Sequence, residues 1–223
     1  MRLRLSRLVP PPKLKRFLPY RDLPVAILDI GCGNHSPTMT KHWFPRSTYC
    51  GLDLERYNNS PEDLKAIDQF YKADLREDLL KQIPDEHFDI ILMAHVVEHI
   101  PNGEDVICRL SRKLKPGGRI YVETPSERSA VLPSGVDCLN FYDDPTHVRL
   151  YTGQELESAC TAAGLDVVAA GLRRDMLWMA VGLALIPKQL SSFARYRKPF
   201  GPGLWDWLGF AQFVEAVKPP KLA

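Results

Sequence analysis

Short apolar runs that alternate with helix-like segments constrain this chain of 223 residues more than any other feature. The short apolar run at 25–30 predicts a buried strand, and glycines follow it directly. Segment 105–114 has apolar residues on one helical face and ends before Pro116-Gly117-Gly118. This alternation predicts an α/β, Rossmann-like fold: a mostly parallel sheet with helices on both faces. The other expected strands are 48–54, 69–73, 87–94, 119–123 and 165–170, and the other expected helices are 62–68 and one that begins at a Thr152/Glu155 capping box.

The composition excludes several classes of protein. Apolar residues make up 45% of the chain and charged residues 25%, which is typical of a folded domain rather than of a disordered or fibrous chain. No apolar run approaches the roughly 18 residues that a membrane helix needs. The five cysteines are scattered, contain no C-x-x-C pair and leave an odd one over, so we expect a reducing compartment and a cytoplasmic protein.

Charge is distributed unevenly. Residues 1–21 carry seven Lys or Arg and no acid, residues 22–172 carry 14 basic and 24 acidic side chains, and residues 173–223 carry 8 basic and 3 acidic. The expected parts are a basic, proline-rich arm (1–24), an α/β core (25–172), an apolar and basic insertion (173–209), and a last strand with a tail (210–223). The basic ends suggest peripheral contact with a membrane, with a solvated arm as the alternative, whereas the acidic middle argues against a nucleic acid partner.

A glycine turn and two acidic residues stand where expected strands end. Gly31 and Gly33 follow the first strand, where glycine lets the backbone approach a ligand closely. Asp53 ends the second strand and Asp74 follows the third, where carboxylates accept hydrogen bonds from ribose hydroxyls or an adenine amine. Each acid alone is equally well explained as a solvated strand end. Because a dinucleotide-binding turn would carry a third glycine at Ser36, an NAD-linked oxidoreductase is the weaker alternative.

The order of these motifs resembles that of class I S-adenosylmethionine-dependent methyltransferases. The resemblance covers roughly 25–172 and rests on LDIGCGN (28–34), GLDL (51–54), AD (73–74), FDII (88–91), HVVEHI (95–100) and LKPGGRIYV (114–122). It implies a seven-stranded sheet with an antiparallel last strand, and S-adenosyl-L-methionine held over the glycine turn as the cofactor. The implied cofactor-binding residues are Asp29, Gly31, Cys32, Gly33, Asn34, Asp53, Leu54, Asp74, Leu75, Ala94 and His95.

The H-x-x-E-H sequence at 95–99 admits more than one interpretation. It matches the inverted zinc-peptidase signature, in which two imidazoles on one helical face bind zinc. Here it follows a buried strand and precedes Pro101, so it occupies one turn, and no third ligand stands out downstream. Ubiquinone-type relatives carry an E-x-x-E-H version linked to a divalent ion, but this chain has His95 in place of the first Glu. We expect Glu98 and His99 to line the cofactor pocket and assign no metal ligand.

The acceptor side is inferred from the chemistry of methyl transfer. Displacement at a sulfonium mainly requires that donor and acceptor are aligned and that water is excluded. A hydroxyl acceptor must also lose a proton, which suits a histidine, so His147 and His95 are the candidate catalytic bases. Segment 144–152 is similar to small-molecule members, including ubiquinone-type O-methyltransferases, in which it borders the substrate. The expected substrate contacts are His99, His147 and Arg149, and the expected acceptor is a small or lipid-like molecule.

The region 173–209 is expected to be an insertion beside the active site. Its segment 176–186 is apolar on nearly every face, and Trp205, Trp207 and several cations follow. A lid over an apolar acceptor, an interfacial membrane anchor and plain core or dimer packing are the alternatives. The last strand is expected at 210–217. A noncatalytic cofactor-binding or membrane-docking protein is the other alternative to an enzyme.

Overall fold

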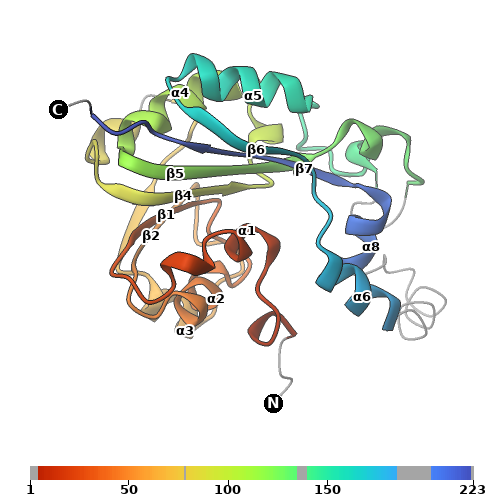
Figure 1. The fold of residues 1–223 in the computed structure, drawn as a ribbon, viewed down its shortest axis with the longest axis horizontal. Coiled ribbons are helices and arrows are strands. Elements are labelled where there is room, and N and C mark those ends of the chain that lie inside the picture. The colour runs from red at the N-terminus through yellow and green to blue at the C-terminus, as the bar shows by residue number, and fades with distance from the viewer. Residues whose placement is uncertain (1–4, 78, 135–139, 185–201, 222–223) are drawn as a thin grey trace.

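A computed structural model of the chain describes residues 5–77, 79–134, 140–184 and 202–221. Seven strands form one mixed sheet in the order β3-β2-β1-β4-β5-β7-β6 (Figure 1). Neighbouring strands from β3 to β5 pair in parallel, whereas β7 pairs antiparallel with both β5 and β6. The predicted fold class is therefore confirmed. The strands are β1 Ala26–Ile30, β2 Thr48–Asp53, β3 Gln69–Lys72, β4 Phe88–Ala94, β5 Leu114–Pro125, β6 Asp166–Leu172 and β7 Ala211–Val217.

Helices cover both faces of the sheet. In Figure 1, α4 and α5 lie on one face, and α1, α2 and α3 lie on the other. The Thr152 capping box forms as predicted, since Thr152 Oγ1 accepts from the Glu155 N–H at 3.1 Å and the Glu155 carboxylate accepts from the Thr152 N–H at 2.7 Å. The α-helices are α1 Pro12–Lys15, α2 Ser36–Trp43, α3 Pro61–Ala66, α4 Gly103–Lys113, α5 Gly153–Ala162, α6 Met176–Ala184 and α8 Pro202–Leu208. Short 3₁₀ turns lie at Leu5–Arg7, Leu18–Tyr20, Leu79–Gln82, Val97–His99, Glu127–Val131 and Phe141–Asp143.

The N-terminal segment, expected as a basic, proline-rich arm, packs against the core of the protein. Leu14 and Phe17 are buried in a cluster with residues of β1, β4 and β5. The cations beside them are each paired: Lys13 with Asp29 at 3.0 Å, Lys15 with Asp175 at 2.9 Å and Arg16 with Glu215. These three cations are therefore engaged within the protein and do not form the free basic surface that membrane contact would use.

Strand β5 is longer than the expected run at 119–123. It begins at Leu114 and includes Pro116 and two glycines that the sequence predicts as a break. A register shift against β4 absorbs the irregularity, since Phe88 pairs with Leu114 but Ile90 pairs with Arg119. The Gly117 N–H donates to the Lys218 carbonyl at 2.8 Å, so the chain after β7 satisfies this backbone group.

The α6/α8 pair sits beyond the ends of β6 and β7 (Figure 1). The two helices approach closely at Gly182 and Gly203, where a Cβ on Gly182 would lie 2.9 Å from the Gly203 Cα. Helix α6 buries Trp178 and Met179 but exposes other apolar side chains, and the end of the predicted apolar run, 185–187, lies outside the described residues. Within the ranges that the structure describes, no helix is long and apolar enough to cross a membrane.

Candidate active site

A cavity of about 1040 Å³ opens at the carboxyl edge of the sheet, where β1, β2, β3 and β4 end. The chain reverses its direction of winding between β1 and β4, and ligands of α/β sheets bind at such a point. The volume suits a cofactor together with a small acceptor. The predicted site residues that line it are Gly31, Gly33, Asn34, Asp53, Leu54, Asp74, Leu75, Ala94, His95 and His99.

The glycine turn after β1 forms the floor of this cavity. Gly31 has φ +70°, and a Cβ there would lie 2.5 Å from a methyl group of Val96. A Cβ on Gly33 would lie 2.8 Å from the Tyr57 carbonyl oxygen. Both distances are too short for any side chain, so the turn requires glycine at these positions. The backbone is thereby left uncovered for a ligand.

Two carboxylates lie at the adenosyl end of the cavity. Burial raises the pKa of Asp53 above its ordinary value, although backbone N–H groups, including that of Leu54 at 2.8 Å, oppose the shift. Asp74 is held by the guanidinium of Arg76, which lowers its pKa, and the two groups are 2.6 Å apart. A carboxylate beside a glycine cradle matches a ribose diol, so the residues present fit an adenosyl group.

Two residues that the resemblance implies do not line the cavity. Asp29 is fully buried, and its carboxylate accepts from Lys13, from Ser36 and from the Tyr49 hydroxyl at 2.7 Å. Lys13 lines the cavity in its place. Cys32 is also fully buried, and burial, followed by the charges of the nearby aspartates, raises the pKa of its thiol to about 12. Its side chain packs against Gly51 of β2, where an added Cβ would lie 2.6 Å from the Cys32 sulfur.

His95 follows β4 in a left-handed conformation with φ +56°, which is uncommon for a residue other than glycine. Its ring nitrogens lie 3.3 Å from a Glu98 oxygen and 3.1 Å from a Glu123 oxygen. Burial alone would lower its pKa, but the two carboxylates raise it to about 9. The two carboxylates therefore favour the protonated imidazole, and the role of His95 as a base stays a prediction.

A buried charge network extends from His95 to the α6/α8 pair, and sequence reasoning missed it. The Arg173 guanidinium lies 2.7 Å from Glu123 and 3.1 Å from Asp206. Glu123, Arg173, Trp178 and Trp205 all line the cavity. Their positions in the sequence could have indicated them, because Glu123 lies near the end of β5 and Arg173 follows β6 directly.

Two further predicted residues lie behind the cavity wall. His147 is nearly buried, and its Nδ1 lies 2.6 Å from the Phe141 carbonyl oxygen. The Arg149 guanidinium is engaged by Glu104 at 2.6 Å and Glu155 at 2.9 Å. Neither residue is in the cavity wall, although Thr146 and Val148 of the same segment are. The guanidinium of Arg149 instead joins α4 to α5, and its expected substrate contact stays a prediction.

The fold and the site define a Rossmann-like α/β protein with a cavity at the carboxyl edge of its sheet whose lining fits an adenosyl group. The model of the family described as "Methyltransferase domain" matches residues 2–170, and the chain belongs to this family. Its fold is similar to that of a SAM-dependent methyltransferase from Archaeoglobus fulgidus, with a TM-score of 0.58, 20% identity, and coverage of 96% of this chain and 93% of the other.

Two curated relatives have different names. The chain is 31% identical over 103 residues to the ubiquinone biosynthesis O-methyltransferase of Dechloromonas aromatica. The aligned region covers 44% of this chain and 43% of the relative. It is 29% identical over 219 residues to the tRNA N(3)-cytidine methyltransferase METTL2 of Gallus gallus. That aligned region covers 87% of this chain and 58% of the relative. The chain thus spans about half the length of these relatives. The predicted methyltransferase family is therefore confirmed.

Proposed function

We propose that this chain transfers the methyl group of S-adenosylmethionine to a small organic acceptor that carries a hydroxyl group. The observation that carries the proposal is the continuity of one cavity, which runs from Asp53 and Asp74 to Arg173 and Trp205. One end fits an adenosyl group, and polar and aromatic side chains line the other end. The volume leaves room for an acceptor beside the cofactor.

An unpaired polar atom at the second end indicates the kind of acceptor. The buried indole N–H of Trp205, which lines the cavity, has no hydrogen-bond partner among the described residues. A buried donor without a partner is costly, so an acceptor that brings an oxygen to Trp205 is favoured. The indole rings of Trp178 and Trp205 offer apolar faces in the same wall. A hydroxylated ring provides both features.

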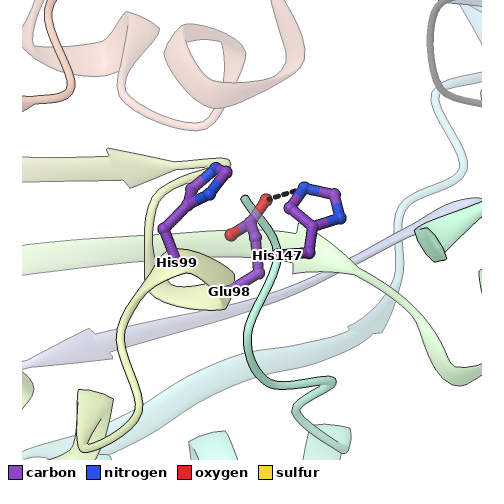
Figure 2. Close-up of side chains that lie close together, drawn as sticks. All are labelled: Glu98, His99 and His147. Atoms are coloured by element: carbon purple, nitrogen blue, oxygen red, sulfur yellow. Dashed lines mark ion pairs between the residues drawn. The ribbon is translucent and has the colours of Figure 1, made fainter. Parts of the chain in front are cut away.

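The chain's own residues align the reactants and balance charge. S-adenosylmethionine supplies the methyl group when it is bound. The glycine turn and Asp53 hold the adenosyl part, and the buried network carries three carboxylates against the cations of His95 and Arg173. The resulting excess of one negative charge favours a sulfonium nearby. His99 also lines this side of the cavity, next to Glu98 (Figure 2), and its Nδ1 lies 3.1 Å from the carbonyl oxygen and 3.0 Å from the hydroxyl oxygen of Thr146.

The acceptor proposal is supported by the relatives named as O-methyltransferases and by the acidic charge of residues 22–172, which carry 14 basic and 24 acidic side chains. The relative named as a tRNA methyltransferase supports the competing acceptor class. Both acceptors are therefore part of the test.

Binding and transfer are tested separately. Calorimetry with S-adenosylhomocysteine should show affinity at least tenfold weaker for Asp53→Asn than for Asp166→Asn, a matched change on an exposed strand residue. Equal affinities would contradict the cofactor site. Transfer from methyl-tritiated S-adenosylmethionine is then measured with hydroxybenzoates, catechols and total tRNA. We expect label in the phenols, and label in tRNA alone would overturn the proposed acceptor class.

A further inference from the structure

A second cavity, of about 520 Å³, lies on the side of the sheet where α1 packs. Residues of α1, of strands β5, β6 and β7, and of the segment that joins β6 to α6 form its wall. Figure 1 shows α1 and α6 on the same side of the sheet. Pro12 and Arg173 line both this cavity and the first one, so the two cavities are neighbours that share these residues as a wall.

Cations outnumber acids in the lining of the second cavity. Besides Arg173, whose charge is balanced within the buried network described above, the described lining residues include four cations and two acids. These are Lys15, Arg16, Arg119 and Arg174 against Asp175 and Glu215. The lining therefore has an excess of two positive charges, which favours a dianion over a neutral or cationic ligand.

Glu215 fixes two of the guanidinium groups in position. It is 2% exposed, and its Oε1 accepts from Arg119 Nη1 at 2.7 Å while its Oε2 accepts from Arg16 Nε. The Arg16 guanidinium also lies 4.8 Å from the centre of the Phe213 ring. One carboxylate neutralises only one of the two guanidinium groups. Because both groups are ordered before a ligand arrives, less conformational entropy is lost when they bind one.

Two of the arginines have donor capacity that the described residues do not use fully. The buried Nε of Arg119 has no hydrogen-bond partner among them. The exposed guanidinium of Arg174 has a contact of 3.4 Å with the Trp207 carbonyl, which is at the long limit of a hydrogen bond. Guanidinium groups present paired N–H donors that match the oxygens of phosphate groups. An anion with several acceptor oxygens is therefore favoured in this cavity.

We propose that the second cavity binds a phosphate monoester on a small carbon skeleton. A phosphate monoester carries a charge of about −1.5 to −2 at pH 7 and three acceptor oxygens, which matches the charge excess and the guanidinium donors. Val168 and Met176 are exposed in the same lining and offer apolar surface to the carbon skeleton. The volume is in the range of small-molecule sites. The proposal is independent of the proposed function, since it uses neither the glycine turn nor Asp53.

The test is calorimetry with glycerol 3-phosphate on the full chain, with and without saturating S-adenosylhomocysteine. Wild type, Arg119→Gln and Arg112→Gln are compared, because Arg112 is exposed on α4 outside the cavity and its substitution removes the same charge. We expect one equivalent in the wild type and in Arg112→Gln, and binding about tenfold weaker or more in Arg119→Gln. Absence of saturable binding in the wild type, equal affinity of the two variants, or displacement by the nucleoside would overturn the site.

A second variant and a second probe guard against a folding defect in Arg119→Gln. Arg174→Gln changes an exposed side chain and should weaken glycerol 3-phosphate about threefold or more while it leaves the circular dichroism spectrum unchanged. Dimethyl phosphate, a monoanion, should bind about tenfold more weakly than glycerol 3-phosphate to the wild type, and equal binding of the two would contradict the charge argument.

The same phosphate monoester group occurs on the headgroup of phosphatidic acid. Sedimentation with phosphatidylcholine vesicles that contain or lack phosphatidic acid separates this source from a soluble ligand. We expect the protein to stay in the supernatant with both kinds of vesicle. Pelleting that requires phosphatidic acid and is lost in Arg119→Gln would overturn the small soluble ligand in favour of a lipid headgroup.

Discussion

Arg173→Met removes the cation that joins the sheet to the α6/α8 pair. Arg173 is 8% exposed, and its two partners are more deeply buried, with Glu123 3% exposed and Asp206 fully buried. Methionine has a similar length and no charge, so the substitution leaves both carboxylates in the interior without their shared partner. Asp206 retains the backbone N–H of Asp175 at 3.0 Å, which compensates only in part.

The expected loss follows from this burial. Breaking a buried ion pair by removal of one partner costs about 3–5 kcal/mol of unfolding free energy, because the remaining charge is not solvated. Arg174→Met is the matched control. The neighbouring guanidinium has a contact of 3.4 Å with the Trp207 carbonyl and is at the surface, so its loss should cost about 0.5 kcal/mol or less.

The loss should also depend on pH. Burial alone would raise the pKa of Glu123, but Arg173 and then His95 lower it to about 2. A carboxyl group whose pKa is lowered on folding stabilises the protein above its unfolded pKa, about 4.3, and this stabilisation disappears as the pH falls toward the folded value. The difference between wild type and Arg173→Met should therefore be largest at neutral pH and should narrow below about pH 4.

Urea unfolding, followed by tryptophan fluorescence and by circular dichroism, measures both effects. A double-mutant cycle with Asp206→Asn isolates the pair, and the double variant should lose less than the sum of the single variants. The reasoning is refuted if Arg173→Met and Arg174→Met lose the same amount, or if the loss grows as the pH falls.

Three further predictions concern the cavity and its borders. Gly33→Ala places a Cβ 2.8 Å from the Tyr57 carbonyl and should weaken S-adenosylhomocysteine binding about tenfold by calorimetry, whereas unchanged affinity would show that the turn tolerates a side chain. Iodoacetamide at pH 8 should modify the partly exposed Cys108 before Cys32, whose thiol pKa is about 12, and peptide mass spectrometry that finds the reverse order contradicts the burial argument. Arg149→Met should leave nucleoside affinity unchanged and cost about 1 kcal/mol or less in urea unfolding, since its ion pairs with α4 and α5 are partly exposed; a large loss of affinity would restore a binding role.

The amino-acid sequence alone determines the strands and the cofactor turn. Aliphatic runs are local patterns, so they predict β1 and β4 closely, and the last strand expected at 210–217 lies at Ala211–Val217. The need for glycine at positions 31 and 33 is also visible locally, because a tight turn after a strand restricts the residue types that fit. Asp53 and Asp74 follow from the same rule, since parallel strands bring their carboxyl ends to one edge.

Only the tertiary structure decides how the charged groups are paired. Lys15 and Asp175 are 160 positions apart, Arg173 and Glu123 are 50 apart, and no periodicity in either segment relates one to the other. The protonation of a titratable group depends on these partners, as when two carboxylates raise the pKa of His95. A hydrophobic pattern depends on residues that are neighbours in sequence, so it can be recognised before the fold is known. The electrostatic environment of a side chain depends on segments that are distant in sequence and meet only after folding.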